Sequence, residues 1–457
     1  MNALIISAVW GVVMMFSGIL LKQRSGIRNL AVAGLVLLLV SNILEMSGTV
    51  FFKVELKGMI VFDRFALFFD SIIFASALIY LFLSARDMEK VGVNYAEYFA
   101  LIFFILCGIT LVASFKSLLI LFLGIEIVSI PLYILTGSEK KNLKSNEASL
   151  KYLLLGSFST AIMLMGIAFV YGATGSFMSA EIIASPGTVS ALLIAGMTLL
   201  LFSMAFKASV VPFHFWAPDV YDGAPTVFAS FMATIVKAAS FIAFIRLFND
   251  LFGDMKPEWQ LWMAVLTAAT LFVGNITAVF QQSVKRMLAY SSVAQAGFMM
   301  FSLYAMNTDA VEGLLLYVAA YSLATIGIFA VLNKMSDYTF DGFNGFAKSQ
   351  PVLAASTTIC LLSLAGIPLT AGFLSKFYML RAAIDTHKNL WLVIFAVVMA
   401  AVSVYYYFRL IQAMYFREGN AHEIEVTPVF KWTMVVVAAL VILLGIFPNL
   451  LLYWFYF

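Results

Sequence analysis

The stretch "SALLIAGMTLLLFSMAFKASVVPFHFWAPDVYDGAPT", residues 190–226, changes character in its middle. Its first part is as apolar as a membrane helix, whereas its second part contains Lys207, His214, two aspartates and three prolines. A proline inside a helix removes a backbone hydrogen bond and breaks or kinks the helix. Irregular backbone at membrane depth is tolerated only where it is buried in protein or lines water. The stretch therefore predicts a membrane helix that is interrupted at a hydrated site.

The rest of the chain has the composition of a membrane protein. Of its 457 residues, 63% are hydrophobic and 11% are charged, whereas ordinary soluble domains carry about 25% charged residues. No segment is long and polar enough to be a soluble domain. We expect an all-α, polytopic membrane protein with about fourteen transmembrane helices, since apolar stretches long enough to span a bilayer recur throughout: 3–21, 29–50, 63–84, 96–114, 117–136, 148–172, 189–211, 226–248, 259–281, 286–306, 310–333, 351–382, 389–416 and 429–453.

The N-terminal segment and the loop charges predict the orientation of the chain. The first apolar segment has no small-residue cleavage site after it, so we expect a retained helix rather than a signal peptide. Lysine and arginine are more frequent in the loops on one side of the predicted spans than in the loops on the other side. Because cytoplasmic loops carry the excess of basic residues, both termini are expected to lie outside the cytoplasm.

The chain lacks the residues for redox or phosphoryl chemistry. Its two cysteines, Cys107 and Cys360, stand alone in apolar segments and are expected to be small buried side chains. An iron–sulfur cluster needs four thiolates or a mixed set of ligands, and the scattered His214, His387 and His422 form no zinc pattern. No glycine-rich nucleotide motif occurs. We expect neither a metal nor a cofactor in this chain.

A repeat relates two parts of the sequence. "EASLKYLLLGSFSTAIMLMGIAFVYG" begins at Glu147 and "EGLLLYVAAYSLATIGIFAVLNKM" begins at Glu312. The two segments are about 165 residues apart, as expected for an internal duplication. They match at Glu147 and Glu312, Tyr152 and Tyr317, Ser157 and Ser322, and Thr160 and Thr325.

Two proline breaks follow the same spacing. "FKASVVPFHFW" is interrupted at Pro212, and "SLAGIPLTAGFLSKF" is interrupted at Pro368. With about five helices in each repeat the second copy must be inverted in the membrane, and paired interrupted helices mark the ion path of many transporters. The predicted division is an N-terminal three-helix segment (1–95), a first repeat (96–250), a second, inverted repeat (251–417) and a C-terminal helix (418–457).

Four charged residues fall inside the predicted spans: Glu126, Lys207, Lys237 and Lys376. Each charge at the centre of a bilayer costs about 2.5–3.5 kcal/mol on insertion scales, so each must find a partner or reach water. Structural alternatives stay open at this point. Lys376 could extend to the membrane surface from a helix end, Lys207 could form a structural ion pair, and Glu126 could be held by Ser129. Lys151, beside Lys144 and Glu147, could be the solvated end of its helix.

The prolines suggest how the buried charges are accommodated. Pro131, Pro212 and Pro368 each free the carbonyl four residues earlier, on Ile127, Ala208 and Leu364. These acceptors lie close in sequence to the charged residues, which predicts hydrated pockets. Lysine is a poor ligand for a metal cation but a good proton carrier, because burial loosens its proton and a nearby carboxylate tightens it again. Buried lysines beside a carboxylate therefore predict a proton relay.

These motifs resemble a known family. "PFHFWAPDVYDGAPT", "FLGIEIVSIPLYIL", "KRMLAYSSVAQAGF" and "LSLAGIPLTAGFLSKFY" are similar to the antiporter-like membrane subunits of bacterial NADH:quinone oxidoreductase (respiratory complex I), which are related to Mrp-type cation/proton antiporters. The resemblance covers essentially the whole chain. "WAPDVY", the lysine at 376 and the absence of a long C-terminal arm resemble the N type rather than the M and L types.

The resemblance implies residue roles. Glu126 would be the carboxylate of the fifth helix and Lys207 its ion-pair partner on the broken seventh helix. Lys237 would be the connecting lysine, Lys376 the lysine of the broken twelfth helix and Lys151 that of the sixth. Pro212, His214, Pro368 and Gln295 would mark the helix breaks and the polar axis. Many relatives have histidine where this chain has Gln295, which cannot titrate, so the link between Lys237 and Lys376 would depend on water.

The resemblance also implies a setting. The chain would be a multi-pass subunit in a bacterial plasma (inner) membrane, would contact the lipid bilayer and other antiporter-like subunits, and would not bind nucleic acid. NADH, FMN, iron–sulfur clusters and quinone would belong to partner subunits, so that the chain acts as part of a proton-translocating enzyme without a redox centre of its own. Three alternatives remain: an Mrp-type sodium/proton antiporter, a subunit of a related hydrogenase or F420-type complex, and a purely structural subunit.

Overall fold

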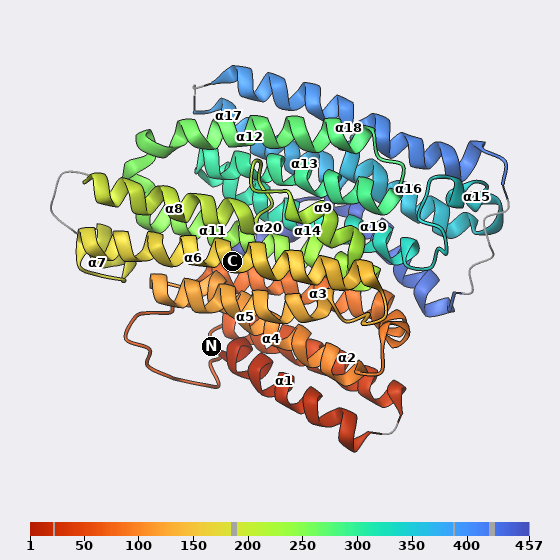
Figure 1. Cartoon of the computed structure of the whole chain (residues 1–457), viewed down its shortest axis with the longest axis horizontal. Coiled ribbons are helices and arrows are strands. Elements are labelled where there is room, and N and C mark those ends of the chain that lie inside the picture. Colours follow the sequence, from red (N-terminus) through yellow and green to blue (C-terminus); the bar gives the residue numbers. More distant parts are fainter. Residues whose placement is uncertain (22, 184–189, 387–388, 420–425, 457) are drawn as a thin grey trace. The chain divides into compact units, whose positions relative to one another are not determined.

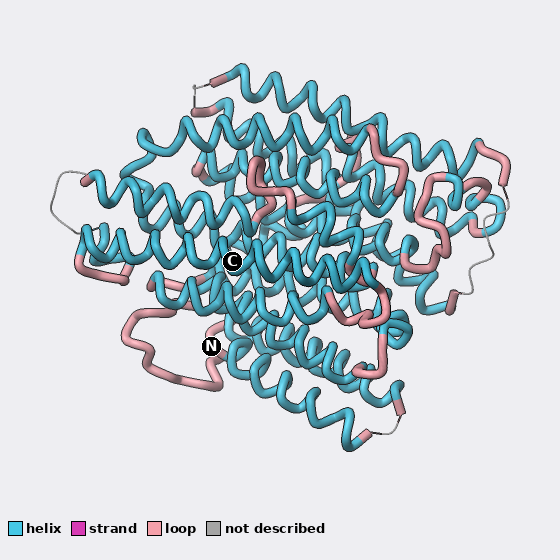
Figure 2. Tube along the Cα trace, in the orientation of Figure 1, coloured by secondary structure: helices cyan, strands magenta, loops and turns pink. Residues whose placement is uncertain are grey.

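The computed structural model describes all residues except 22, 184–189, 387–388, 420–425 and 457 (Figures 1 and 2). His387 and His422 therefore lie outside the described residues. The described residues form helices joined by loops. Strand-like pairing among them is limited to isolated backbone bridges, Ile60 to Phe115, Ser117 to Met178 and Ser283 to Thr339. Among these residues, ten continuous helical stretches are long and apolar enough to cross a membrane, and two shorter apolar helices accompany them. The predicted polytopic, all-α membrane fold is confirmed.

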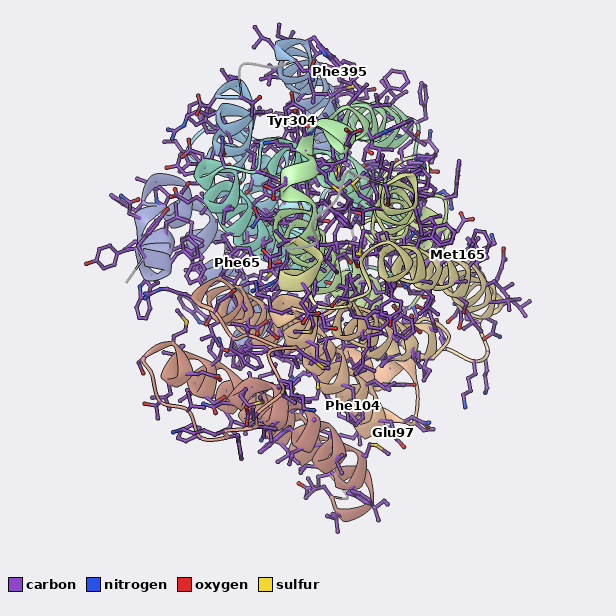
Figure 3. All side chains as sticks on the ribbon, turned by 90° about the vertical axis from the view of Figure 1, so that its left-hand side faces the viewer. Phe65, Glu97, Phe104, Met165, Tyr304 and Phe395 are labelled. Atoms are coloured by element: carbon purple, nitrogen blue, oxygen red, sulfur yellow. The ribbon has the colours of Figure 1, made fainter. Side chains whose placement is uncertain are left out.

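The chain divides into two compact units, which are described separately. Unit 1 comprises Met1–Leu78, Met88–Ala208 and Val236–Leu261. Its helices are α1 (Asn2–Leu20), α2 (Arg24–Met46), most of α3 (Arg64–Val91), α4 (Tyr95–Ser114), α5 (Leu118–Thr136), α6 (Leu143–Thr174), α7 (Ser179–Ile183), α8 (Ala191–Lys207) and α11 (Lys237–Phe252). Within it α4 packs on α1 and α5, and α6 packs on α8. The other face of α6 is apolar and exposed, as at Met165 (Figure 3), which suits contact with lipid.

Unit 2 comprises Ile79–Asp87, Ser209–Ile235 and Trp262–Phe457. Its helices are α9 (Trp216–Gly223), α10 (Thr226–Phe231), most of α12 (Lys256–Val279), α13 (Val284–Ala305), α14 (Thr308–Leu332), α15 (Phe346–Ser349), α16 (Pro351–Ala365), α17 (Ala371–Ile384), α18 (Leu390–Phe416), α19 (Pro428–Ile446) and α20 (Asn449–Tyr456). Helix α14 packs against α16, α17 and α19 and is fully buried over its apolar window. The predicted repeat boundaries do not coincide with these units and stay a prediction.

The helix starts carry the same signals in both copies of the repeat. Ser117 caps α5 and Ser283 caps α13, whereas Asn142 caps α6 and Asn307 caps α14. Such side chains accept the free N–H groups of the first turn. Just past the two serines, Leu118 N donates to Phe177 O (2.9 Å) and Val284 N donates to Tyr338 O (2.7 Å). The equivalent local contacts support the internal duplication that the sequence indicates.

Both predicted helix breaks are present. Helix α8 ends at Lys207, and α9 begins at Trp216 after an irregular segment that contains Pro212. Helix α16 ends at Ala365, and α17 begins at Ala371 after the segment with Pro368. A third irregularity, which the sequence did not indicate, is the π-helical turn Met232–Val236 immediately before Lys237. Single π turns inside helices are frequent at functional sites.

Candidate functional site: buried lysines at helix breaks

Lys207 lies at the edge of a cavity in unit 1. The cavity has an empty volume of about 400 Å³, and α4, α5, α6, α8 and α11 supply its lining. Its polar lining includes Lys207, Ser129, Tyr152 and Ser240. Lys207 is the last residue of α8, and its half-buried ammonium donates to Ser129 Oγ at 3.0 Å. The helix break thus ends beside a cavity with several polar lining groups, and its hydration stays a prediction.

Glu126 is near Lys207 and contacts a neighbouring helix. It lies on α5, and its carboxylate accepts a hydrogen bond of 2.7 Å from Thr160 of α6. The ion pairs given for the described part of the chain do not include Glu126 with Lys207, and their pairing stays a prediction. Ser129 accepts from Lys207, and the hydrogen bond given for Glu126 comes from Thr160 rather than from Ser129. The hydroxyl group of Thr160 contacts Glu126, and that of Ser129 contacts Lys207.

Lys237 is the most deeply buried of the lysines expected in the relay. It is the first residue of α11, directly after the π turn, and only 2% of it is exposed. The Lys207 cavity is lined by Val236, at the end of the π turn, and by Ala239 and Ser240 of α11. A lysine this deeply buried is costly, and its neighbours along the chain line the cavity that Lys207 borders.

Lys151 lies in a different environment. It forms an ion pair of 2.7 Å with Glu147, one helical turn away on α6, and the two side chains are 42% and 64% exposed. The structure therefore places Lys151 at an exposed stretch of helix, as the structural alternative stated. Its neighbour Tyr152 lines the cavity, but Lys151 does not share the burial of the other three lysines.

Lys376 is enclosed at the second helix break, in unit 2. It is 5% exposed, which excludes the alternative that it extends to the membrane surface. Its ammonium donates to the carbonyl of Leu364 at 2.6 Å and lies 4.4 Å from the ring centroid of Phe298. Leu364 is the residue whose carbonyl Pro368 was expected to free. The break in the backbone therefore supplies the oxygen that holds the buried cation.

Gln295 of α13 links this site to a group of tyrosines. Its Nε2 donates to Leu364 O at 2.9 Å and to the Tyr407 hydroxyl at 2.9 Å, while its Oε1 accepts from the Tyr317 hydroxyl. Tyr407 in turn shares a hydrogen bond with Ser291. Every one of these groups is buried. The amide is held at both of its ends, so it positions the Leu364 carbonyl and connects it to neutral hydroxyl groups.

His214 lies in the irregular segment after Lys207 and belongs to unit 2. It is 5% exposed, its ring lies tilted against that of Phe215 with centroids 4.5 Å apart, and its Nδ1 has no hydrogen-bond partner among the described residues. Pro212, two residues earlier, interrupts the helix as expected. The structure thus confirms the break and leaves an imidazole nitrogen available in it.

The ammonium groups of both lysines at the breaks lie at the carboxyl end of a half-helix. Lys207 ends α8, and Lys376 reaches back from α17 to the last turn of α16. The free carbonyl groups at such an end carry a partial negative charge, which favours a cation within the last turn. The contacts that the structure gives these ammonium groups are to neutral oxygens rather than carboxylates. An ammonium held in this way can give up its proton without leaving an unpaired carboxylate behind.

Sequence reasoning missed several participants. The contacts of Thr160 with Glu126 and of Phe298 with Lys376 were not expected, nor were those of Tyr317 and Tyr407 with Gln295. The repeat contained a signal for two of them, since Thr160 and Tyr317 are among its matched positions. For Phe298 and Tyr407 no signal stands out, because a phenylalanine or tyrosine in an apolar helix is an ordinary core residue.

Known proteins give the same assignment. Residues 115–403 match the family described as NADH:quinone oxidoreductase/Mrp antiporter, transmembrane part. NADH-quinone oxidoreductase subunit N of Cytophaga hutchinsonii is 41% identical, over 99% of both chains. A chain of respiratory complex I from Thermus thermophilus with bound aureothin has 33% identity, a TM-score of 0.85 and 98% coverage of each chain.

A more distant structure shares the fold alone. The match in the Mrp complex from Dietzia has 17% identity and a TM-score of 0.86, over 99% of this chain and 96% of the other. The identity and coverage of the nearer relatives decide the family. This multi-pass membrane protein belongs to the NADH:quinone oxidoreductase/Mrp antiporter family and, within it, to the subunit N proteins of NADH-quinone oxidoreductase.

Proposed function

We propose that this chain is a proton-translocating membrane subunit of a respiratory NADH:quinone oxidoreductase. The observation that carries the proposal is the pair of lysines at the two helix breaks, each held by neutral oxygens rather than by a carboxylate. A structural cation would be stabilised best by a direct salt bridge with further hydrogen bonds. Lysines that must bind and release protons are served better by hydroxyl and carbonyl acceptors.

The proposed path uses the three buried lysines in order. Protons enter at Lys207 from the cytoplasmic side, pass Lys237 and leave from Lys376. Glu126 sets how firmly Lys207 holds its proton, and the hydroxyl of Thr160 sets the position of Glu126. Lys151, exposed and paired with Glu147, is the outlying member of the proposed set. Gln295 and its tyrosines keep the Leu364 carbonyl in place for Lys376.

The proposed setting follows from the family. The chain would lie in a bacterial plasma membrane with both termini outside the cytoplasm and would assemble with other antiporter-like subunits. NADH, FMN, iron–sulfur clusters and quinone would bind to partner subunits. The two repeats, residues 96–250 and 251–417, would each form one half-channel, and the redox reaction elsewhere in the complex would drive both.

The test is the proton-to-electron ratio of the assembled complex in sealed vesicles. We expect Lys207→Ala and Lys237→Ala to permit assembly but to lower this ratio, because each removes one carrier from the path. Lys431→Ala, at an exposed lysine of α19, is the matched control and should leave the ratio unchanged. An unaltered ratio in both buried-lysine variants would contradict the relay.

An Mrp-type sodium/proton antiporter is the second candidate, since an Mrp chain shares this fold. Sodium requires a cage of oxygen ligands, whereas the helix breaks present ammonium groups. Sodium-driven proton movement in vesicles that contain this chain alone would favour the antiporter. Copurification of the neighbouring subunits distinguishes a quinone reductase from a hydrogenase or F420-type complex.

A further inference from the structure

A second buried carboxyl group lies outside the lysine sites. Asp70 is on α3 in unit 1, and its exposed fraction is 0%. Neither of its carboxyl oxygens accepts a hydrogen bond from any residue that the structure describes. Glu126, the carboxylate assigned to the relay, differs from it in both respects, since it is half-buried and accepts from Thr160. Asp70 is thus the more isolated of the two carboxyl groups.

The groups around Asp70 already have other partners. Those that face it are the Met1 ammonium of α1, Glu45 of α2, the Thr110 hydroxyl of α4 and Arg246 of α11. The ammonium donates to Glu45 Oε1 at 2.6 Å, and Arg246 donates to Asp63 and to the Ala113 carbonyl. Thr110 donates to the Leu106 carbonyl of its own helix at 3.1 Å. Among the described residues, Thr110 is the neutral donor next to Asp70, and its hydroxyl is bonded to Leu106 instead.

A carboxylate in such a place would be very unstable. Burying an ionised carboxyl group without hydrogen bonds costs so much that the group takes up a proton instead. Burial is the largest contribution to this cost; the Glu45 carboxylate adds to it, whereas the Met1 ammonium and Arg246, which pair with Glu45 and Asp63, oppose it. In the arrangement described, Asp70 therefore holds a proton and is neutral.

Thr110 provides a way to stabilise the other state. A threonine that bonds to its own helix can rotate its hydroxyl without moving the backbone, and the hydroxyl lies beside Asp70. Glu45, 8% exposed, connects the same cluster to the exposed residues 47–50 that follow α2. A released proton would move from the Asp70 carboxyl to the Glu45 carboxylate, while Thr110 turns to donate to the new anion.

We propose that Asp70 is a reversible proton-binding site in the N-terminal helices, that Glu45 exchanges its proton with the surface, and that Thr110 is the positioning residue for the deprotonated form. This site is separate from the lysine relay and does not depend on it. It assigns a function to the three-helix segment that the relay leaves without one.

Infrared spectroscopy of the assembled complex at neutral pH tests the site directly. The wild-type protein should show a carbonyl stretching band of a protonated carboxyl group that is lost in Asp70→Asn. Asparagine has the shape of the neutral acid, so assembly should persist. Asp309→Asn, at an aspartate that pairs with Arg381 at an exposed position, is the control and should lose no such band. A band that survives in Asp70→Asn would overturn the proposal.

Transfer to heavy water tests reversibility. The band assigned to Asp70 should shift as its proton exchanges, and the exchange should slow several-fold in Glu45→Gln. A band that never shifts would mean a permanently sealed proton and would overturn the exchange. Because the band is observed without pumping, failure of this proposal is distinguishable from failure of the lysine relay.

Thr110→Val tests the positioning residue. Loss of one hydrogen bond to the anion should raise the affinity of Asp70 for its proton by about tenfold, so that the band persists to a higher pH. Thr267→Val removes a hydroxyl of the same kind, which donates to Met263 O of its own helix at 2.6 Å, and should leave the titration of the band unchanged. An unshifted titration in Thr110→Val would remove Thr110 from the proposal.

Discussion

Lys207 and Lys376 occupy the two helix breaks but are held in different ways. Lys207 ends its half-helix, borders a cavity and donates to the Ser129 hydroxyl, with Glu126 on the same helix as that serine. Lys376 lies inside its half-helix, is enclosed under Phe298 and donates to the Leu364 carbonyl. Both ammonium groups use the carboxyl end of a half-helix, where cations are favoured.

The two breaks differ in which part of the surroundings of the lysine can change. A hydroxyl group rotates and a carboxylate can gain or lose charge, so the environment of Lys207 can change without movement of the backbone. The acceptor of Lys376 is a backbone carbonyl that Gln295 also contacts, so its environment changes only if the helix break itself moves. We infer that the first break is controlled by charge and the second by backbone geometry.

The largest expected effect comes from altering that geometry at Gly366. This residue has φ +82°, and a Cβ there would lie 3.3 Å from Cδ of Lys376. Gly366→Ala should cost about 1–2 kcal/mol in backbone strain and should also displace the lysine from Leu364. We expect proton-coupled turnover to fall about tenfold, since 1.4 kcal/mol corresponds to that factor.

Gly175→Ala is the matched control. Gly175 has φ +75°, and a Cβ there would meet nothing within 4 Å, so the substitution adds the strain without the crowding. Equal losses of turnover in the two variants would show that backbone strain, and not the position of Lys376, limits the rate.

A smaller effect is expected at the charge-controlled break. Glu126→Gln removes the anion near Lys207 while keeping a side chain that can bind Thr160. Lysine holds its proton less firmly without a nearby anion, so the activity at neutral pH should fall roughly fivefold and its alkaline limit should move to lower pH. Quinone reduction measured against pH checks this, with Glu147→Gln at the exposed pair as control. A pH profile that does not move would contradict control by charge.

Tyr317→Phe should have a still smaller effect, confined to the second break. The change leaves Gln295 Oε1 without its donor, and an unsatisfied buried acceptor costs about 1–3 kcal/mol. Thermal unfolding of the complex should reveal this loss, with a two- to threefold fall in turnover. Tyr80→Phe removes a buried hydroxyl that donates to the Val227 carbonyl at 3.0 Å, away from Lys376. Tyr80→Phe should lower the thermal stability of the complex to a similar extent but leave turnover unchanged.

Lys151→Ala should have the smallest effect. Its ion pair with Glu147 is exposed, and pairs of this kind contribute about 0.3–0.5 kcal/mol. We expect turnover in vesicles to change by less than a factor of about two. A loss as large as that of Lys207→Ala would instead place Lys151 among the residues that carry the proton.

Much of the fold could be predicted from the sequence. The apolar segments coincide with helices or with pairs of half-helices, and the breaks fall at Pro212 and Pro368. The burial of Cys107, Lys237 and Lys376 was also expected. These features depend on composition within about 20 residues and on the missing N–H of proline, which are local properties of the chain.

The partners of the charged groups could be predicted only in part. The carbonyl of Leu364 was expected to be free because Pro368 follows it four residues later, and it accepts from Lys376. The pairing of Glu126 with Lys207 stays a prediction, whereas the hydroxyl groups of Thr160 and Ser129 that contact them were not both expected. Hydroxyl groups are too common in membrane helices for sequence alone to show which of them lies within reach of a charge.

The sequence by itself determined that this protein spans a membrane, where two of its helices break, and that Glu126, Lys207, Lys237 and Lys376 fall within its apolar spans. Only the tertiary structure decided which oxygen each ammonium meets. Ser129 is 78 residues from Lys207, and Gln295 is 69 residues from Leu364. Hydrophobicity and proline act along the chain, whereas a hydrogen bond of about 3 Å depends on how helices from distant parts of the sequence pack together.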